Sequence, residues 1–145
     1  MSNDQRLLDR RILIVDDDAD IRESFEAALQ AEGALTLVAP DGNEAIRIVS
    51  EDPPELVVLD MMLPKRSGFL VLEKIKGYEE SPAVIMVTAY EGKRHQAYAE
   101  SLGVDDYLQK PVPLSKLIAT AVRLLERRDE LLGMEDDSED DAPKA

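Results

Sequence analysis

Short apolar runs recur along this chain at a spacing that suits strands separated by helices. They occupy residues 12–15, 35–38, 56–59, 84–87 and, more weakly, 107–108. Their starts lie 23, 21, 28 and 23 residues apart, which leaves room for a helix after each run. Runs of about four leucines and β-branched residues are typical of strands buried on both faces, as in parallel sheets. We therefore predict five parallel strands that are covered by helices on both sides.

The segments between these runs carry apolar residues at helical spacing. Gly33 and Gly77 offer stop signals for the first and third segments, and Ser67 can cap the third. The fourth segment has the weakest apolar pattern. Its apolar face is predicted to consist of Ala97, Tyr98 and Leu102. The predicted helices span about residues 21–32, 41–52, 67–77, 91–102 and 114–132.

This strand–helix unit occurs five times, which is the pattern of an α/β fold with helices on both faces of one parallel sheet. We predict a flavodoxin-like, doubly wound (βα)5 architecture whose strands lie in the order 2-1-3-4-5. In such a sheet the ligand binds beside the carboxyl ends of the strands, near the point where the strand order reverses. Residues that end a strand or begin the next loop are therefore the candidates for a functional site.

Polar residues follow four of the predicted strands at their carboxyl ends. They are Asp16, Asp17 and Asp18 after the first strand, Asp60 after the third, Thr88 after the fourth and Lys110 after the fifth. Each of them, taken alone, also suits an ordinary turn, strand or surface position. These four strands are neighbours in the predicted sheet, however, so their ends converge on one crevice. Their joint placement is what indicates a site.

This set of side chains suits a divalent cation and phosphoryl transfer. Carboxylates within a few ångströms repel one another, so a cation is needed if all are to stay ionised. Mg²⁺, or Mn²⁺ in its place, is a hard ion that prefers carboxylate and phosphate oxygens, whereas Zn²⁺ favours His and Cys. The only histidine, His95, lies on a predicted helix. An aspartate can also attack phosphorus and form an aspartyl phosphate, whose oxygens Lys110 and Thr88 would bind.

Composition indicates the class of protein and its surroundings. The 145 residues are 44% hydrophobic and 33% charged, which fits one globular domain. The formal net charge of −14 argues against direct binding to DNA or to a membrane surface, since both need clustered Lys and Arg. No apolar run approaches the roughly 20 residues of a bilayer span. The chain also lacks cysteine and an apolar signal stretch, so we expect a cytoplasmic protein.

Four motifs, ILIVDDD, LVVLDMMLPKRSGF, VIMVTAY and DDYLQKP, occur in order along the chain. Together they resemble the receiver domain of response regulators from two-component signal transduction, over about residues 10–128. The resemblance implies that Asp60 is the phosphoacceptor. It also implies that Asp16, Asp17 and Asp60 bind Mg²⁺ or Mn²⁺, with the backbone carbonyl of Met62 as a further ligand.

The resemblance assigns the remaining strand-end residues to the response to phosphorylation. Thr88 and Lys110 would bind phosphoryl oxygens, and Tyr107 would turn inward when Thr88 moves toward the phosphoryl group. The Lys110–Pro111 peptide bond is expected to be cis, a conformation found in only about 5% of X–Pro bonds. Tyr90 lies where members of the family tune the lifetime of the phosphoryl group.

The resemblance further implies a switch protein and not an enzyme, apart from Mg²⁺-dependent self-phosphorylation and slow autodephosphorylation. A sensor histidine kinase, a phosphotransfer protein or a small phosphodonor would supply the phosphoryl group. A downstream protein partner would bind the face formed by the fourth helix, fifth strand and fifth helix, and a phosphorylation-linked homodimer is left open. We expect an N-terminal extension over residues 1–9, a stand-alone receiver domain over 10–132 and an acidic, disordered tail over 133–145.

Three other hypotheses remain at this point. A dehalogenase-like phosphatase also uses an aspartate nucleophile, but it needs a second aspartate two residues later, where this chain has Met62. A flavin-binding module would need a phosphate loop after Val15, where this chain has three acids that would repel the phosphate of FMN. The chain could also be a fragment of a longer regulator, because the predicted last helix continues past Arg128.

Overall fold

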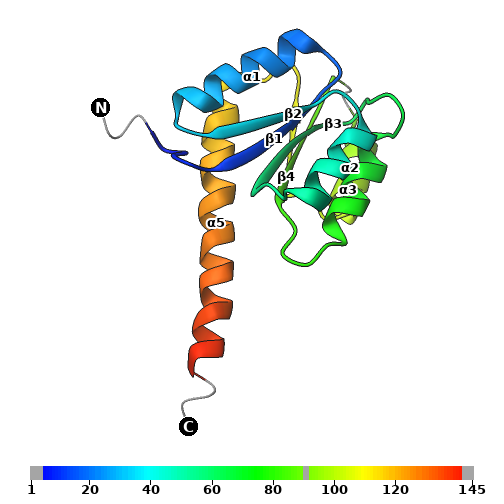
Figure 1. The fold of residues 1–145 in the computed structure, drawn as a ribbon. Helices are drawn as coiled ribbons and strands as arrows, with labels where there is room; N and C mark the ends of the chain where they lie inside the picture. The colour runs from blue at the N-terminus through cyan, green and yellow to red at the C-terminus, as the bar shows by residue number, and fades with distance from the viewer. Residues whose placement is uncertain (1–4, 90–91, 142–145) are drawn as a thin grey trace.

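The five predicted strands form one parallel sheet between two layers of helices (Figure 1). The computed structural model describes residues 5–89 and 92–141, with side chains described up to residue 133. The strand order is β2-β1-β3-β4-β5, which confirms the predicted flavodoxin-like class and its order 2-1-3-4-5. The strands are β1 (Arg11–Val15), β2 (Leu35–Ala39), β3 (Leu56–Asp60), β4 (Ala83–Thr88) and β5 (Asp106–Gln109). The helices are α1 (Ala19–Ala31), α2 (Gly42–Glu51), α3 (Gly68–Lys76), α4 (Lys93–Ser101) and α5 (Leu114–Asp141).

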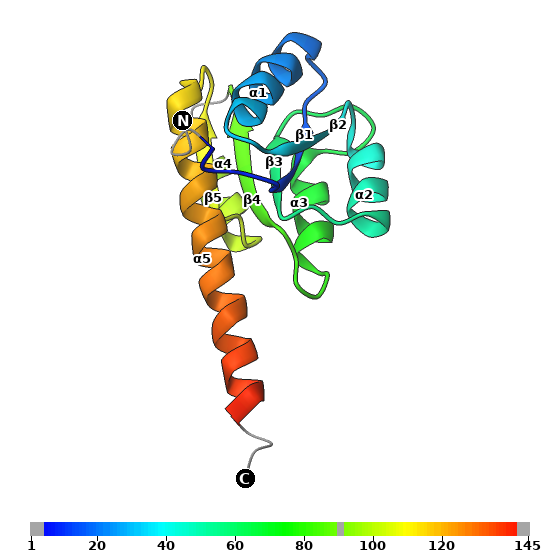
Figure 2. The same cartoon turned by 60° about the vertical axis from the view of Figure 1, so that its left-hand side comes forward.

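Alternate residues of the central strands face two separate cores. Ile12 and Ile14 of β1 pack with residues of α1 and α5, whereas Leu13 and Val15 pack with residues of α2, α3 and α4. Figures 1 and 2 show this division, with α1 and α5 on one side of the sheet and α2 and α3 on the other. Strands β3 and β4 are buried along their whole length, as continuous apolar runs in a parallel sheet require.

Three helices begin with a capping side chain that the sequence supplies. The Asp18 carboxylate accepts hydrogen bonds from the N–H groups of Asp20 and Ile21 in the first turn of α1. Asp41 and Ser67 each accept one such bond in the first turn of α2 and α3. Asp18 therefore has a structural role, which separates it from Asp16 and Asp17 although the three acids are adjacent. The caps also set where each helix begins after the loop that follows its strand.

Strand β2 is less buried than the apolar run predicted. It lies at the edge of the sheet and pairs with β1 alone, and Leu35 and Val38 are 54% and 38% exposed. The prediction of burial on both faces is thus wrong for this strand. An edge strand has a neighbouring strand on one side only. The helices that cover the sheet therefore leave part of both faces of β2 exposed to solvent.

Helix α4 turns a different face to the core from the one predicted. Ala99 is its buried residue, whereas Ala97 is exposed and Tyr98 is 50% exposed. Leu102 does pack against the core, so the buried stripe runs through Ala99 and Leu102, three residues apart. Helix α4 has nine residues and few large apolar side chains, so its sequence does not fix which face lies against the core. Contacts with the rest of the domain decide this.

Helix α5 is longer than the predicted span, which ended at residue 132. It continues to Asp141 and so enters the segment that we expected to be a disordered tail. Helix propensity only partly supports this extension. Its two glutamates are good helix formers and Gly133 costs a helix only about 1 kcal/mol, but its four aspartates are poor helix formers. None of the described helices, α5 included, is long and apolar enough to span a membrane.

Part of the predicted N-terminal extension packs onto the domain. Leu7 is 1% exposed and belongs to the core between the sheet, α1 and α5. The backbone N–H of Leu7 donates to the carbonyl of Glu32 at 2.9 Å, and that of Asp9 donates to Gly33 at 2.9 Å. Residues 5–9 therefore close the end of the sheet opposite the carboxyl ends of the strands.

Truncation of Leu7 is expected to show that this segment stabilises the fold. Leu7→Ala removes a fully buried side chain and should lower the free energy of unfolding by about 2–4 kcal/mol. Leu8→Ala is the matched control, because Leu8 is 57% exposed and its loss should change stability by less than about 0.5 kcal/mol. Urea denaturation followed by circular dichroism measures both. Equal effects of the two substitutions would contradict the packing of Leu7.

Candidate functional site

The structure brings the acids from the ends of β1 and β3 into one cluster. Val15 lies beside Leu59 in parallel register, so the residues that follow these strands meet at the same edge of the sheet. One carboxylate oxygen from each of Asp16, Asp17 and Asp60 lies within 4.8 Å of the others. Asp16 and Asp60 are 2% and 5% exposed, whereas Asp17 is exposed. The cluster is therefore buried at its base and open to solvent at Asp17.

Hydrogen bonds hold both carboxylate oxygens of Asp16 and its backbone carbonyl. Its Oδ1 accepts from the backbone N–H of Asp18 at 2.9 Å, and its Oδ2 accepts from Nζ of Lys110 at 2.9 Å. The guanidinium of Arg22, in α1, donates to the backbone carbonyl of Asp16 at 2.7 Å. Sequence analysis missed Arg22, although a basic residue six positions after the acid, at the start of a helix, was a visible signal. These bonds fix the Asp16 carboxylate before any ligand binds.

Asp60 ends β3 and lies in the same cluster. Its Oδ1 accepts from the N–H of Met62 at 3.1 Å, and its Oδ2 lies 3.4 Å from Nζ of Lys110. Burial raises the pKa of Asp60 above its usual value, and the charge of Asp16 adds to this effect. The Met62 N–H and the Lys110 ammonium act in the opposite direction without cancelling it. The ionised form of Asp60 is thus poorly stabilised by the protein alone.

Lys110 joins the end of β5 to both buried acids. Its backbone N–H donates to the carbonyl of Thr88 at 2.7 Å, and its peptide bond to Pro111 is cis. Burial lowers the pKa of the ammonium, but the hydrogen bond to Asp16 and the charge of Asp60 outweigh burial. The pKa of Lys110 therefore lies above its usual value. The site holds a permanent positive charge at neutral pH.

Thr88 and Tyr107 link the site to β5. Thr88 ends β4 and is fully buried, while Tyr107 is half-buried and forms a side-chain hydrogen bond with Thr88. The Tyr107 hydroxyl also lies 3.8 Å from Sδ of Met61, to which it donates. Burial raises the pKa of Tyr107, although the Thr88 hydrogen bond lowers it. A displacement of the Thr88 hydroxyl would therefore change the hydrogen bonding of the Tyr107 hydroxyl.

The charge balance of the cluster fits a divalent cation. Three carboxylates face the single ammonium of Lys110, which leaves two negative charges uncompensated when all the acids are ionised. Each acid offers an oxygen, and the set contains neither His nor Cys, which suits Mg²⁺ or Mn²⁺. Met62 lies two residues after Asp60 in the chain. The role of its backbone carbonyl as a metal ligand stays a prediction. Tyr90 lies outside the described residues.

Gly68, which sequence analysis missed, allows the loop after Asp60 to close. Its N–H donates to the carbonyl of Met61 at 2.9 Å. A Cβ at this position would lie 2.5 Å from the carbonyl oxygen of Asp60 and 2.7 Å from Cα of Met61. Only glycine fits at such a distance from backbone atoms. The Ser-Gly pair at the start of a predicted helix was the available signal.

Comparison with known proteins identifies the family. The sequence profile of the response regulator receiver domain matches residues 12–122. This chain belongs to that family. The response regulators MprA of Mycolicibacterium vanbaalenii and Mycobacterium tuberculosis are each 36% identical to this receiver domain over 117 residues. The match covers 81% of this chain and 51% of each relative, so the chain spans about half the length of these curated relatives.

Solved structures show the same receiver fold. The signal receiver domain of a putative LuxO repressor protein from Vibrio parahaemolyticus has a TM-score of 0.83 and 26% identity, covering 88% of this chain and 98% of that one. A CheY-like receiver domain from Methanospirillum hungatei has a TM-score of 0.81 and 30% identity, covering 84% and 98%. NtrX from Brucella abortus, with a TM-score of 0.83 and 30% identity, is matched over 89% of this chain and only 29% of its own.

Proposed function

We propose that this receiver domain is a switch that accepts a phosphoryl group on Asp60 from a sensor histidine kinase, a phosphotransfer protein or a small phosphodonor. The observation that carries the proposal is the convergence of three acids and a lysine. Asp16, Asp17 and Asp60 have carboxylate oxygens within 4.8 Å of one another, and Nζ of Lys110 lies 2.9 Å from Asp16 and 3.4 Å from Asp60. This constellation can hold a cation and a phosphoryl group side by side. Sensor kinases phosphorylate their partners inside the cell, so the proposal places the protein in the cytoplasm.

The chemical step requires a carboxylate nucleophile and compensation of charge. An oxygen of Asp60 attacks the phosphorus of the donor, a P–O bond forms, and the bond from phosphorus to the leaving group breaks with its electron pair. Lys110 lies close enough to Asp60 to meet one oxygen of the incoming group, and Thr88 can donate its hydroxyl to another. A Mg²⁺ ion held by Asp16, Asp17, Asp60 and the Met62 carbonyl would neutralise a further oxygen.

The output of the switch would be a changed surface formed by α4, β5 and α5. Thr88 moves toward the new phosphoryl group, and its hydrogen bond to Tyr107 transmits the change to β5. Lys93 and Lys116 lie beside Tyr107 around a hollow on this surface. These two lysines favour a downstream protein with acidic or polar side chains at the contact. A phosphorylation-linked homodimer would use the same population shift.

Phosphorylation from acetyl phosphate tests the proposal directly. Incubation with acetyl phosphate and Mg²⁺ is expected to add the mass of one phosphoryl group to the intact protein, and EDTA is expected to prevent this. Hydroxylamine is expected to remove the group, because it cleaves acyl phosphates. Absence of the mass shift, or a shift that resists hydroxylamine, would contradict an aspartyl phosphate.

A matched pair of neighbouring aspartates tests the metal site. Asp17→Asn removes one proposed ligand and is expected to weaken Mg²⁺ or Mn²⁺ binding by about tenfold or more. Asp18→Asn removes the same charge one residue away, but it retains the α1 cap because asparagine caps helices as well as aspartate does. Calorimetric titration should therefore give nearly unchanged affinity for this control. Equal weakening by both substitutions would indicate a general charge effect and not ligation.

A further inference from the structure

Contacts from β2, α1 and the end of β5 fix the backbone and side chain of Asp16. Its N–H donates to the carbonyl of Ala39, the last residue of β2, at 3.1 Å. Its carboxylate accepts from the N–H of Asp18 and from Lys110, and its carbonyl accepts from the guanidinium of Arg22 at 2.7 Å. Asp16 is 2% exposed, so its polar groups depend on partners within the protein. Removal of Arg22 would take away the partner of the carbonyl group.

Asp17 has no such support from side chains. Its carboxylate is exposed and forms no hydrogen bond or ion pair within residues 5–89 and 92–133. One of its oxygens nevertheless lies within 4.8 Å of oxygens of Asp16 and Asp60. The direction of the Asp17 side chain is therefore set by its own backbone, which begins at the peptide bond from Asp16. The carbonyl oxygen of this peptide unit is the atom that Arg22 binds.

A rigid element carries Arg22 to this position. Arg22 lies in the first turn of α1, and its backbone N–H donates to the carbonyl of Asp18 at 3.0 Å. The same helix is anchored in the core by the buried side chains of Phe25 and Leu29. A group that is held by a packed helix is placed more precisely than a group on a loop. The contact thus ties the loop after β1 to the helix that follows it.

We propose that Arg22 is a positioning residue for the metal site, which holds the Asp16–Asp17 peptide unit so that both carboxylates stay within reach of one cation. The inference rests on the function proposed above, in which these acids and Asp60 bind Mg²⁺. Because a peptide unit is planar, a hydrogen bond to its carbonyl oxygen restricts the rotation of the whole unit. A rotation would move the Asp17 carboxylate away from the two buried acids. Arg22 therefore lowers the Mg²⁺ concentration at which the site fills.

The charge of Arg22 acts in the opposite direction, but its effect is smaller. A guanidinium beside the acids repels Mg²⁺ and weakens its binding. Arg22 is half-buried, where salt screens charges, so this repulsion is expected to change the affinity by less than about fivefold. Residues that orient metal ligands are worth about 10–100-fold in affinity. Loss of Arg22 is therefore expected to weaken Mg²⁺ binding even though it removes a positive charge.

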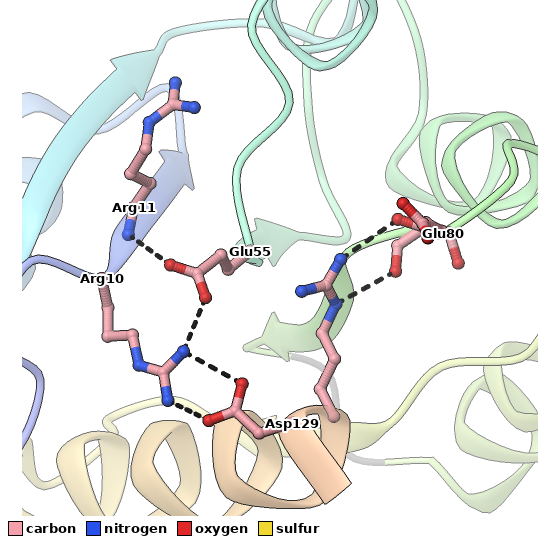
Figure 3. A network of polar contacts seen from close by, with 7 residues as sticks. Arg10, Arg11, Glu55, Glu80 and Asp129 are labelled. Carbon is pink, nitrogen blue, oxygen red and sulfur yellow. Dashed lines mark hydrogen bonds and ion pairs between the residues drawn. The ribbon is translucent and has the colours of Figure 1, made fainter. Parts of the chain in front are cut away.

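Arginines also hold backbone and side chains at the opposite end of the sheet. Arg10 donates to Glu55, just before β3, and to both carboxylate oxygens of Asp129, and so attaches α5 to the domain (Figure 3). Arg128, on the same helix, donates to the backbone carbonyl of Glu80 at 3.2 Å in the loop before β4. This contact joins an arginine to a backbone carbonyl far from the carboxyl ends of the strands. Arg128 is therefore a matched control for Arg22.

Calorimetric titration with Mg²⁺, at about 0.15 M salt and without phosphodonor, tests the inference. Arg22→Gln is expected to raise the dissociation constant for Mg²⁺ by about tenfold. Arg128→Gln removes the same charge and the same kind of contact, and it is expected to leave this constant within about twofold of the wild-type value. Thermal unfolding without metal is expected to show similar losses of stability in both variants. A purely structural role of Arg22 would therefore not account for the difference in Mg²⁺ affinity.

The Mg²⁺ dependence of phosphorylation by acetyl phosphate provides a second measurement. For Arg22→Gln, the Mg²⁺ concentration that gives half the maximal rate is expected to rise by about tenfold. The maximal rate at saturating Mg²⁺ is expected to stay within about threefold of wild type, because Arg22 acts on the metal ligands and does not contact Asp60 in the described residues. General damage to the site would instead lower the rate at every Mg²⁺ concentration.

Three results would overturn the role of Arg22. Unchanged or tighter Mg²⁺ binding by Arg22→Gln would show that its charge alone acts on the cation. An equal loss of affinity in Arg128→Gln would show that the contact with Asp16 is not responsible. A rate that stays low at saturating Mg²⁺ would exclude positioning of the metal ligands as the cause. Failure of the proposed function has a different signature, since the wild-type protein itself would then not bind Mg²⁺ or accept the phosphoryl group.

Discussion

Asp60→Asn is expected to abolish phosphorylation by acetyl phosphate, while the protein remains folded. The amide nitrogen and oxygen of asparagine cannot form an acyl phosphate, so the loss should be complete and not partial. The asparagine oxygen can still accept the hydrogen bond from the N–H of Met62. Intact-mass spectrometry after incubation with acetyl phosphate and Mg²⁺ measures the result.

The stability of Asp60→Asn shows whether phosphorylation is lost because the nucleophile is missing or because the fold is damaged. Burial raises the pKa of Asp60, so its ionised form is less favourable in the folded protein than in the unfolded chain. A neutral side chain of the same shape removes that cost, and the melting temperature of Asp60→Asn is expected to equal or exceed that of the wild type. A phosphoryl group that persists in the variant would place the phosphoacceptor elsewhere.

Gly68→Ala is expected to damage both the fold and the site. The added Cβ would lie 2.5 Å from the carbonyl oxygen of Asp60 and 2.7 Å from Cα of Met61, and backbone atoms cannot move aside as a flexible side chain could. We expect a loss of about 2 kcal/mol in the free energy of unfolding, as for other overpacked positions. Displacement of Asp60 is expected to slow phosphorylation by about tenfold or more.

Gly133→Ala is the matched control for this prediction. Gly133 also lies in a helix, but nothing lies within 4 Å of the position its Cβ would take. Alanine is the better helix former, so this substitution is expected to raise stability, by up to about 1 kcal/mol. Chemical denaturation of both variants measures the difference. A loss of stability in both, or in neither, would show that the close approach at Gly68 does not decide the effect.

The proximity of the site residues could be predicted because it follows from topology. A parallel sheet aligns the carboxyl ends of its strands, so Asp16, Asp60 and Lys110 had to meet once the strand order was inferred from the apolar runs. The motifs then added the chemistry through the family resemblance. Arg22 and Gly68 were missed because one acts on a backbone carbonyl and the other through the lack of a side chain. The signals they did leave, a basic residue near the start of one helix and a Ser-Gly pair at the start of another, are not specific to these functions.

The sequence by itself determined the order of the elements, the fold class, the cap of the third helix by Ser67 and the residues at the strand ends. All of these depend on local periodicity or on chain connectivity. Only the tertiary structure decided the exposure of β2, the face of α4, the burial of Leu7 and the attachment of α5 through Arg10 and Asp129. These features depend on contacts between segments up to 119 residues apart, whose packing and charges no local pattern encodes.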